Sequence, residues 1–229
     1  MSGLAIAERP SPNHDARAST AKIDMLILHY TGMRSGDEAI ERLCDRAAKV
    51  SAHYVVEKDG RIVRLVDEER RAWHAGVSYW GGETDINGHS IGIEIVNPGH
   101  EFGYQEFPDA QMASVTALCL DIMARHPIPA ARVVGHSDVA PDRKQDPGEL
   151  FNWRGLAAKG VGLWPDTPPI PTPLGEERAR TALTRIGYNP DIVLMTVVIA
   201  FQRHFRPARV DGVLDEETMT LIGAYDAIS

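Results

Sequence analysis

Residues 25–32 read MLILHYTG, a stretch that passes from an apolar run into polar residues and a glycine. The mainly apolar run over residues 23–28 predicts a buried strand. His29 follows it directly, so this side chain lies where a central strand gives way to a loop, a common place for active-site groups. A histidine at a strand end is more often structural, and the position alone leaves a ligand role open.

A second strand is indicated further along the chain. Ile91, Ile93 and Ile95 alternate with Gly92 and Glu94, and this period of two points Glu94 away from the face that its apolar neighbours bury. A carboxylate in an otherwise apolar strand must find water, a partner or a reaction. We therefore expect Glu94 to face a cleft.

The patterns around these two strands predict the fold class. Apolar residues at helical spacing indicate helices over 40–47 and 112–122, and the Asp59-Gly60 pair indicates a hairpin, because a tight turn requires positive φ angles. A short strand over 132–135 ends at His136. The order of strand, helix, hairpin, strand, helix and strand predicts an α/β fold, with a central mixed β-sheet flanked by helices.

The strongest internal boundary lies over residues 163–175, where five prolines exclude both helix and ladder. After it, apolar residues at helical spacing over 194–205 and 218–222 predict a second, small all-helical domain. The expected parts are an N-terminal extension over 1–22, the main domain over 23–165, a proline-rich linker over 166–175 and the helical domain over 176–229.

Composition excludes several classes of function. The chain has 229 residues, 43% of them hydrophobic, and a formal net charge of −8, which argues against nucleic acid or an anionic membrane as partner. No stretch approaches the ~20 apolar residues of a membrane span. Residues 1–22 do not resemble a secretory signal, which favours a cytoplasmic location over a periplasmic or outer-membrane-associated one. Oligomeric state is left open.

A metal site is suggested by two residues near the end of the main domain. His136 ends the short strand, and Asp146 follows ten positions later, within the segment KQDPG at 144–148. Together with His29 they would give two imidazoles and one carboxylate, with a fourth position for water, as catalytic zinc requires. Bound zinc lowers the pKa of water to ~7. For Asp146, a turn-forming role before proline is the alternative.

A rival metal is suggested by His136-Ser137-Asp138, which has the His-x-Asp spacing of a facial triad that holds non-haem iron. This pair lacks a natural third ligand. The downstream histidine, His204, lies beyond the proline-rich segment in the helical domain. The sequence therefore favours zinc over iron.

Four ordered segments resemble the bacterial zinc N-acetylmuramoyl-L-alanine amidases of the AmpD and AmiD kind, which are related in fold to peptidoglycan recognition proteins. The resemblance covers roughly residues 20–165. It implies hydrolysis of the amide bond between N-acetylmuramic acid, or its 1,6-anhydro form, and L-alanine in peptidoglycan or muropeptides, during cell-wall turnover and recycling. The segments are MLILHYTG (25–32), SAHYVVEKDGRIVRLVDEERRAWHAG (51–76), IGIEIVNPG (91–99) and VVGHSDVAPDRKQDPG (133–148).

The resemblance also implies roles for single residues. His29, His136 and Asp146 correspond to the ligands of one Zn²⁺ per chain, and Glu94 to the catalytic carboxylate that takes a proton from water. Lys144 corresponds to the cation near the developing oxyanion. Without the resemblance, Lys144 could equally be a solvated loop lysine.

Two further expectations concern substrate. Trp73, His74 and Ala75 are expected to form part of the groove that receives sugar and stem peptide, although aromatic residues there could equally belong to the core. The helical domain resembles a peptidoglycan-binding module, with matching pieces at 201–202 and 211–218. Binding peptidoglycan without cutting it is the alternative function, since related proteins do this; the complete set of metal ligands argues for the enzyme.

Overall fold

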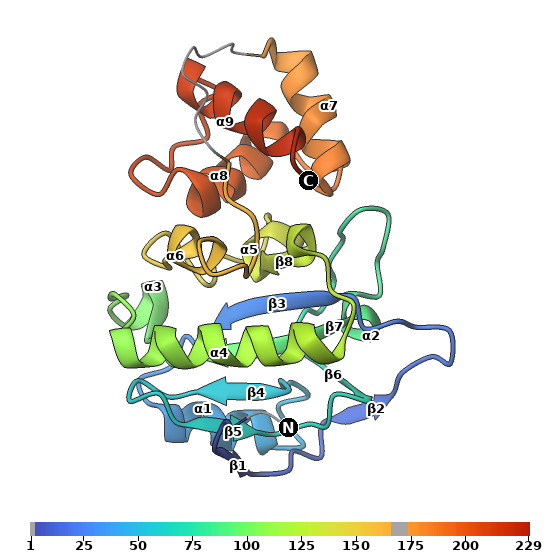
Figure 1. Cartoon of the computed structure of the whole chain (residues 1–229), viewed down its shortest axis with the longest axis vertical. Coiled ribbons are helices and arrows are strands. Elements are labelled where there is room, and N and C mark those ends of the chain that lie inside the picture. Colours follow the sequence, from blue (N-terminus) through green and yellow to red (C-terminus); the bar gives the residue numbers. More distant parts are fainter. Residues whose placement is uncertain (1–2, 166–173) are drawn as a thin grey trace.

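The strand predicted just before His29 lies inside a six-stranded mixed sheet (Figure 1). The computed structural model describes residues 3–165 and 174–229. Strand β3 (Met25–Tyr30) pairs in parallel with β7 (Ser90–Ile95) on one side and with β8 (Val133–Gly135) on the other. The strand order is β1-β5-β4-β7-β3-β8. The predicted fold class is confirmed.

The hairpin makes the sheet mixed. Strand β4 (Tyr54–Val56) is antiparallel to β5 (Ile62–Arg64) and parallel to β7. Gly60, in the turn, has a φ of 88°, which a residue with a side chain rarely adopts. The hairpin predicted from the Asp59-Gly60 pair is therefore confirmed.

Residues before position 22, expected as an extension, add strands to the main domain. Strand β1 (Ile6–Glu8) pairs in parallel with β5, at the edge of the large sheet. Strand β2 (His14–Ala16) forms a second, two-stranded sheet with β6 (Arg70–Ala72). This segment is therefore held by backbone hydrogen bonds rather than lying apart from the domain.

The described residues contain nine α-helices and one 3-10 helix. The helix expected over 40–47 starts earlier and ends earlier: Ser35 caps its first turn by accepting a hydrogen bond from the Glu38 N–H, and Ala47 lies outside it. The helices are α1 (Gly36–Cys44), α2 (Ile86–His89), α3 (Gly99–Phe102), α4 (Asp109–Arg125), η1 (Ala130–Arg132), α5 (His136–Val139), α6 (Trp153–Ala157), α7 (Glu176–Ile186), α8 (Leu194–Phe205) and α9 (Glu216–Asp226).

The two faces of the large sheet have different chemistry. One face presents Leu26, Leu28 and Ile93, which belong to one buried hydrophobic cluster with residues of α4. Figure 1 shows α4 running across the sheet. The opposite face carries His29 and Glu94 on the same strands, because side chains alternate along a strand. The apolar face thus anchors the strands, and the opposite face is free to carry polar side chains.

The C-terminal helices share a core with that opposite face. Residues 176–229 are called the helical unit below. Met25 and Ile27 of β3 belong to one buried cluster with Leu183, Val198 and Phe201 of this unit. In Figure 1, α7, α8 and α9 lie together at one end of the molecule, beyond α5 and α6. Most of the expected linker, residues 166–173, lies outside the described residues, and the four-part division remains a prediction. No helix within 3–165 and 174–229 has the length and apolar character needed to cross a membrane.

Candidate active site

The register of two central strands brings a histidine and a carboxylate together. In the parallel pairing of β3 with β7, His29 lies opposite Glu94, so both side chains project from the same face of the sheet. Val55 of β4 is the next residue across from Glu94. The two polar side chains therefore stand on rigid, hydrogen-bonded strands. The alternation in the sequence predicted this for Glu94, whereas His29 was expected just after its strand and lies within β3 instead.

Three side chains that are far apart in the sequence meet at this face. His29 Nδ1 lies 2.9 Å from His136 Nδ1, and both nitrogens lie 3.0 Å from Asp146 Oδ2. All three residues are buried. The loop that carries Asp146 folds back because the Ser137 N–H donates to the Asp146 carbonyl at 2.9 Å.

A chain of hydrogen bonds behind His29 determines which of its nitrogens carries the proton. Ser90 Oγ donates to the Ile86 carbonyl at 2.6 Å, so it can only accept from His74 Nε2, 3.2 Å away. His74 Nδ1 then accepts from His29 Nε2 at 3.1 Å. This leaves His29 Nδ1 with a free lone pair, directed at His136 and Asp146.

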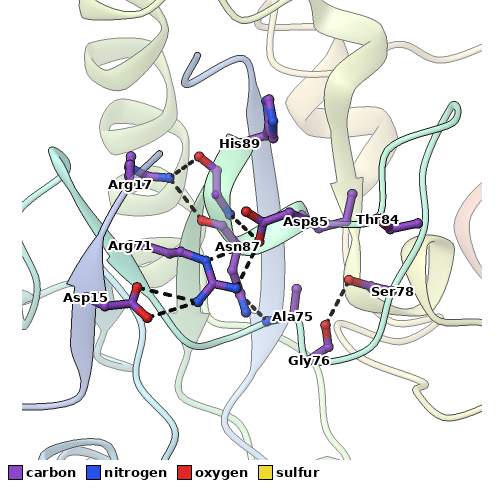
Figure 2. Close-up of polar contacts among 12 residues, drawn as sticks. Asp15, Arg17, Arg71, Ala75, Gly76, Ser78, Thr84, Asp85, Asn87 and His89 are labelled. Atoms are coloured by element: carbon purple, nitrogen blue, oxygen red, sulfur yellow. Dashed lines mark hydrogen bonds and ion pairs between the residues drawn. The ribbon is translucent and has the colours of Figure 1, made fainter. Parts of the chain in front are cut away.

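His136 is oriented in the same way from the other side. Its Nε2 lies 3.1 Å from the Ala75 carbonyl, which can only accept, so Nδ1 is again the free nitrogen. The side-chain oxygen of Asn87 fixes this backbone by accepting from the N–H groups of His74 and Ala75, at 3.0 and 2.8 Å. Figure 2 shows the contact between Asn87 and Ala75. Both imidazoles are thus held by hydrogen bonds on their far nitrogens, as metal ligands usually are.

The donor set fits a metal cation. Two unprotonated nitrogens and a carboxylate oxygen, packed within about 3 Å, would repel one another without a positive charge between them. Burial, followed by the neighbouring His136, lowers the pKa of His29 to about 4. Neutral imidazoles and an ionised carboxylate are the forms that bind metal.

Glu94 lies in the wall of a cavity of about 410 Å³ that also includes His136 and Asp146. Its Oε2 is buried and has no hydrogen-bond partner among the described residues. Burial, followed by the charge of Asp146, raises the pKa of Glu94 well above its usual value, while Lys144 opposes this rise. A carboxylate with a raised pKa and a free oxygen can accept and return a proton.

The other residues predicted from the sequence occupy two places. Lys144, Trp73 and His74 line the same cavity as Glu94. Ala75 is fully buried and lies behind His136. Its backbone carbonyl, rather than its side chain, contacts His136 by accepting a hydrogen bond from Nε2. Ala75 is therefore placed to support the candidate metal ligand His136; its contact with substrate remains a prediction.

The iron alternative does not fit the geometry. His136 directs Nδ1 at Asp146, whereas Asp138 turns the opposite way and accepts from His204 Nδ1 at 2.8 Å. The three residues considered for iron therefore do not converge on one point. Among the described residues, the one group of histidines and carboxylates able to hold a metal is His29, His136 and Asp146.

Sequence reasoning missed the supporting residues Ser90 and Asn87. One signal was present, because Gly92 interrupts an otherwise apolar strand. An isolated glycine in a strand often marks a place where another group lies close against the strand backbone. A Cβ on Gly92 would overlap the His74 ring. The glycine thus makes room for the histidine that orients His29.

A second, larger cavity of about 660 Å³ lies beside the first and is lined by Val77, Tyr79, Ile192 and others. Arg143 belongs to the walls of both cavities. The larger cavity contains none of the three candidate metal ligands, so the smaller one is the candidate active site.

Comparisons with known proteins agree with this geometry. The family model described as N-acetylmuramoyl-L-alanine amidase matches residues 19–149. The chain is 37% identical to N-acetylmuramoyl-L-alanine amidase AmiD of Escherichia coli, over 91% of this chain and 84% of that protein. It is 34% identical to 1,6-anhydro-N-acetylmuramyl-L-alanine amidase AmpD of Enterobacter cloacae, over 63% of this chain and 84% of that one.

Solved structures give the same result. The structure of AmiD from Escherichia coli, in complex with anhydro-N-acetylmuramic acid-L-Ala-D-γ-Glu-L-Lys, superimposes with a TM-score of 0.80 at 38% identity, over 91% of both chains. AmpDh3 from Pseudomonas aeruginosa gives a TM-score of 0.81 at 31% identity, over 96% of this chain and 98% of that one. The chain belongs to the N-acetylmuramoyl-L-alanine amidase family.

Proposed function

We propose that this protein is a zinc-dependent amidase that cleaves the bond between N-acetylmuramic acid, in its ordinary or 1,6-anhydro form, and L-alanine. The observation that carries the proposal is the convergence of three lone pairs, from His29, His136 and Asp146, beside the unpartnered oxygen of Glu94. Two imidazoles and a carboxylate, with room for a fourth ligand, suit zinc in a hydrolytic site.

A zinc ion held by these three ligands supplies Lewis-acid chemistry, which polarises a carbonyl and allows water to ionise near neutral pH. Glu94 Oε2 accepts the proton of the attacking water and then delivers it to the departing alanine nitrogen. The Lys144 ammonium, on the same cavity wall, stabilises the negative charge that develops on the carbonyl oxygen. The route needs no covalent bond between enzyme and substrate.

The substrate class follows from the relatives. The Escherichia coli AmiD structure holds an anhydromuramyl tripeptide, and AmpDh3 from Pseudomonas aeruginosa was solved with an anhydromuramic pentapeptide. We therefore propose peptidoglycan fragments that carry a stem peptide. Trp73, half-buried in the cavity wall, offers an apolar surface for the sugar or the first peptide residues. The cytoplasmic location and a wall-binding role for residues 176–229 remain predictions.

The test is hydrolysis of a defined N-acetylmuramyl tripeptide and its anhydro form by metal-quantified protein. We expect mass spectrometry to show a free peptide that begins with L-alanine, lost after chelation and restored by Zn²⁺. Asp146→Ala should abolish both metal retention and cleavage, and Glu41→Gln, at an exposed position of α1 outside the cavity, should leave both unchanged. An intact substrate in the presence of bound zinc would instead indicate a recognition protein.

A further inference from the structure

A buried carboxylate joins the C-terminal helical unit to the short helix that carries His136. Asp138, two residues after His136 in α5, is 1% exposed. Its Oδ2 accepts from the Gly135 N–H at 2.7 Å and from His204 Nδ1 at 2.8 Å, and its Oδ1 accepts from the Tyr188 hydroxyl at 2.7 Å. His204 belongs to α8, and Tyr188 follows α7.

Both donors are held firmly by their surroundings. The His204 ring is stacked against Trp153 at 3.8 Å on one side and Phe205 at 3.9 Å on the other. Tyr188 is 1% exposed, and its ring packs edge-on against Trp80 at 5.0 Å. Their positions are therefore set by tight packing, and they can impose a position on the carboxylate that they share.

Helix α5 needs such support. It spans four residues, His136–Val139, and a single turn has no stability of its own because helix nucleation is unfavourable. The free nitrogen of His136 is aimed by two constraints: the Ala75 carbonyl, which holds Nε2, and the backbone of α5, which positions the side chain. Asp138 is the buried acceptor through which the helical unit fixes that backbone.

We propose that Tyr188 and His204 are positioning residues for the metal site, and that the helical unit thereby acts as a structural part of the catalytic centre. The inference rests on the proposed function in taking His136 as a metal ligand. Both residues lie outside residues 19–149, which the family model matches. A wall-binding module attached only by a linker would have no reason to place two buried donors on a carboxylate beside the ligand.

The test compares variants of the full chain that change one hydrogen bond at a time. Tyr188→Phe removes one hydroxyl from the network. Tyr225→Phe is the matched control, because Tyr225 is equally buried in the same helical unit and makes no side-chain hydrogen bond within the described residues. His204→Asn keeps a donor near the position of Nδ1, and His204→Leu removes it.

The readouts are the Zn²⁺ dissociation constant, measured by competition with a chromophoric chelator, and the visible absorption spectrum of the Co²⁺-loaded protein. Hydrogen-bonding partners behind metal ligands typically change metal affinity by about 10- to 100-fold, and we expect about tenfold weaker binding for Tyr188→Phe and His204→Leu. Their cobalt spectra should also shift. Tyr225→Phe should match the wild type, and His204→Asn should recover most of the affinity.

Two outcomes would overturn the proposal. One is wild-type zinc affinity in Tyr188→Phe and His204→Leu. The other is equal weakening in Tyr188→Phe and Tyr225→Phe, which would indicate a general loss of stability. Because metal binding is measured without substrate, wild-type protein that binds zinc but leaves the muramyl peptide intact would count against the proposed hydrolysis and not against this inference.

Discussion

At the residue scale, the side chains of the candidate site restrict one another's hydrogen-bonding roles. Ser90 can only accept from His74, His74 can then only accept from His29, and His29 is left with Nδ1 free. The hydrogen bond of one buried serine hydroxyl thus determines, through His74, which nitrogen of the candidate ligand His29 is free. Neutral histidines are required throughout, and burial, followed by the nearby His29, lowers the pKa of His74 well below its usual value.

Glu94→Gln tests the proton-transfer step. The amide keeps the size of the side chain but cannot accept a proton from water, so we expect hydrolysis to fall by about 10²- to 10⁴-fold, the usual contribution of a general base. Zinc content should stay the same, because Glu94 is not among the three residues whose ligand atoms converge. The measurement is the initial rate on the muramyl tripeptide beside the metal content of each preparation.

A rate within a factor of a few of the wild type would remove Glu94 from the mechanism. Loss of both the hydrolysis rate and the bound metal would mean that Glu94 supports the metal site instead. Glu57→Gln is a suitable control, because Glu57 is a partly exposed carboxylate at the end of β4, outside the cavity.

The predicted residues and the missed ones differ for a physical reason. His29 and Glu94 could be singled out because His29 directly follows an apolar run and Glu94 interrupts an apolar strand. A carboxylate in such a strand must find a hydrogen-bond partner, water or a reaction. Ser90 and Asn87 are ordinary polar residues in their local sequence, and their roles depend on the packing of α2 against both β6 and β7. Such packing between distant segments leaves no local pattern, apart from the glycine that makes room for His74.

At the element scale, the Glu68 carboxylate joins strand β4 to the end of helix α4. It accepts hydrogen bonds from Tyr54 of β4 at 2.7 Å, and from Arg125 and His126 at the end of α4 at 2.6 and 2.7 Å. Burial would raise the pKa of Glu68, but these hydrogen bonds outweigh it and lower the pKa to about 2. The last turn of α4 is thereby fixed to the hairpin side of the sheet.

Glu68→Gln is expected to make stability less dependent on pH. A carboxyl group whose pKa is lowered on folding stabilises the protein above its unfolded pKa of 4.5, and this contribution is lost as pH falls towards about 2. The shift corresponds to at most about 3 kcal/mol, and solvent screening at this partly exposed site reduces it. Urea unfolding between pH 7 and pH 3 should therefore show a steeper fall in the free energy of unfolding for the wild type than for the variant.

The neighbouring exposed Glu69 provides the control for this series. Glu69→Gln should follow the wild-type pH dependence, since Glu69 makes no side-chain hydrogen bond within the described part of the chain. Parallel pH profiles for wild type and Glu68→Gln would show that the three-way contact does not hold α4 in solution.

Element boundaries show where local pattern is insufficient. The apolar spacing over 40–47 predicted a helix, and α1 instead runs from Gly36 to Cys44. Its start depends on the Ser35 cap, and its end on Asp45, whose N–H bonds back to the Arg42 carbonyl in an extended conformation. Strand ends shifted as well, since the run predicted over 23–28 corresponds to β3 over Met25–Tyr30. The hairpin was located more closely, because the Asp59-Gly60 turn limits where its two strands can begin and end.

At the scale of the whole molecule, the two units expected from the sequence share one core. The proline-rich boundary suggested a helical domain that is connected to the main domain by a linker. Instead, Leu183, Val198 and Phe201 pack in the same buried cluster as Met25 and Ile27 of the central strand β3. The amino-acid composition indicates a linker. Whether the two units on either side of it pack against each other depends on contacts between residues that are far apart in the sequence.

This shared core predicts that the molecule unfolds as one cooperative unit. Leu183 is 2% exposed, and Leu183→Ala should cost about 2–5 kcal/mol, the usual effect of removing a buried leucine. Although the substitution lies in α7, we expect it to lower the stability of the β3 and β7 amides by the same amount. Hydrogen exchange of the metal-free protein in increasing urea, followed by mass spectrometry of peptides from both units, measures this.

Val193→Ala is the control, because Val193 is 67% exposed and its truncation should change stability by less than about 0.5 kcal/mol. If α7 and α8 exchanged at lower urea than β3 and β7, the helical unit would be a separately folding module. In that case Leu183→Ala would destabilise the helices alone. Equal loss of protection in both units means that any substitution in the helical core also weakens the strand that carries His29, so the metal site depends on the full length of the described chain.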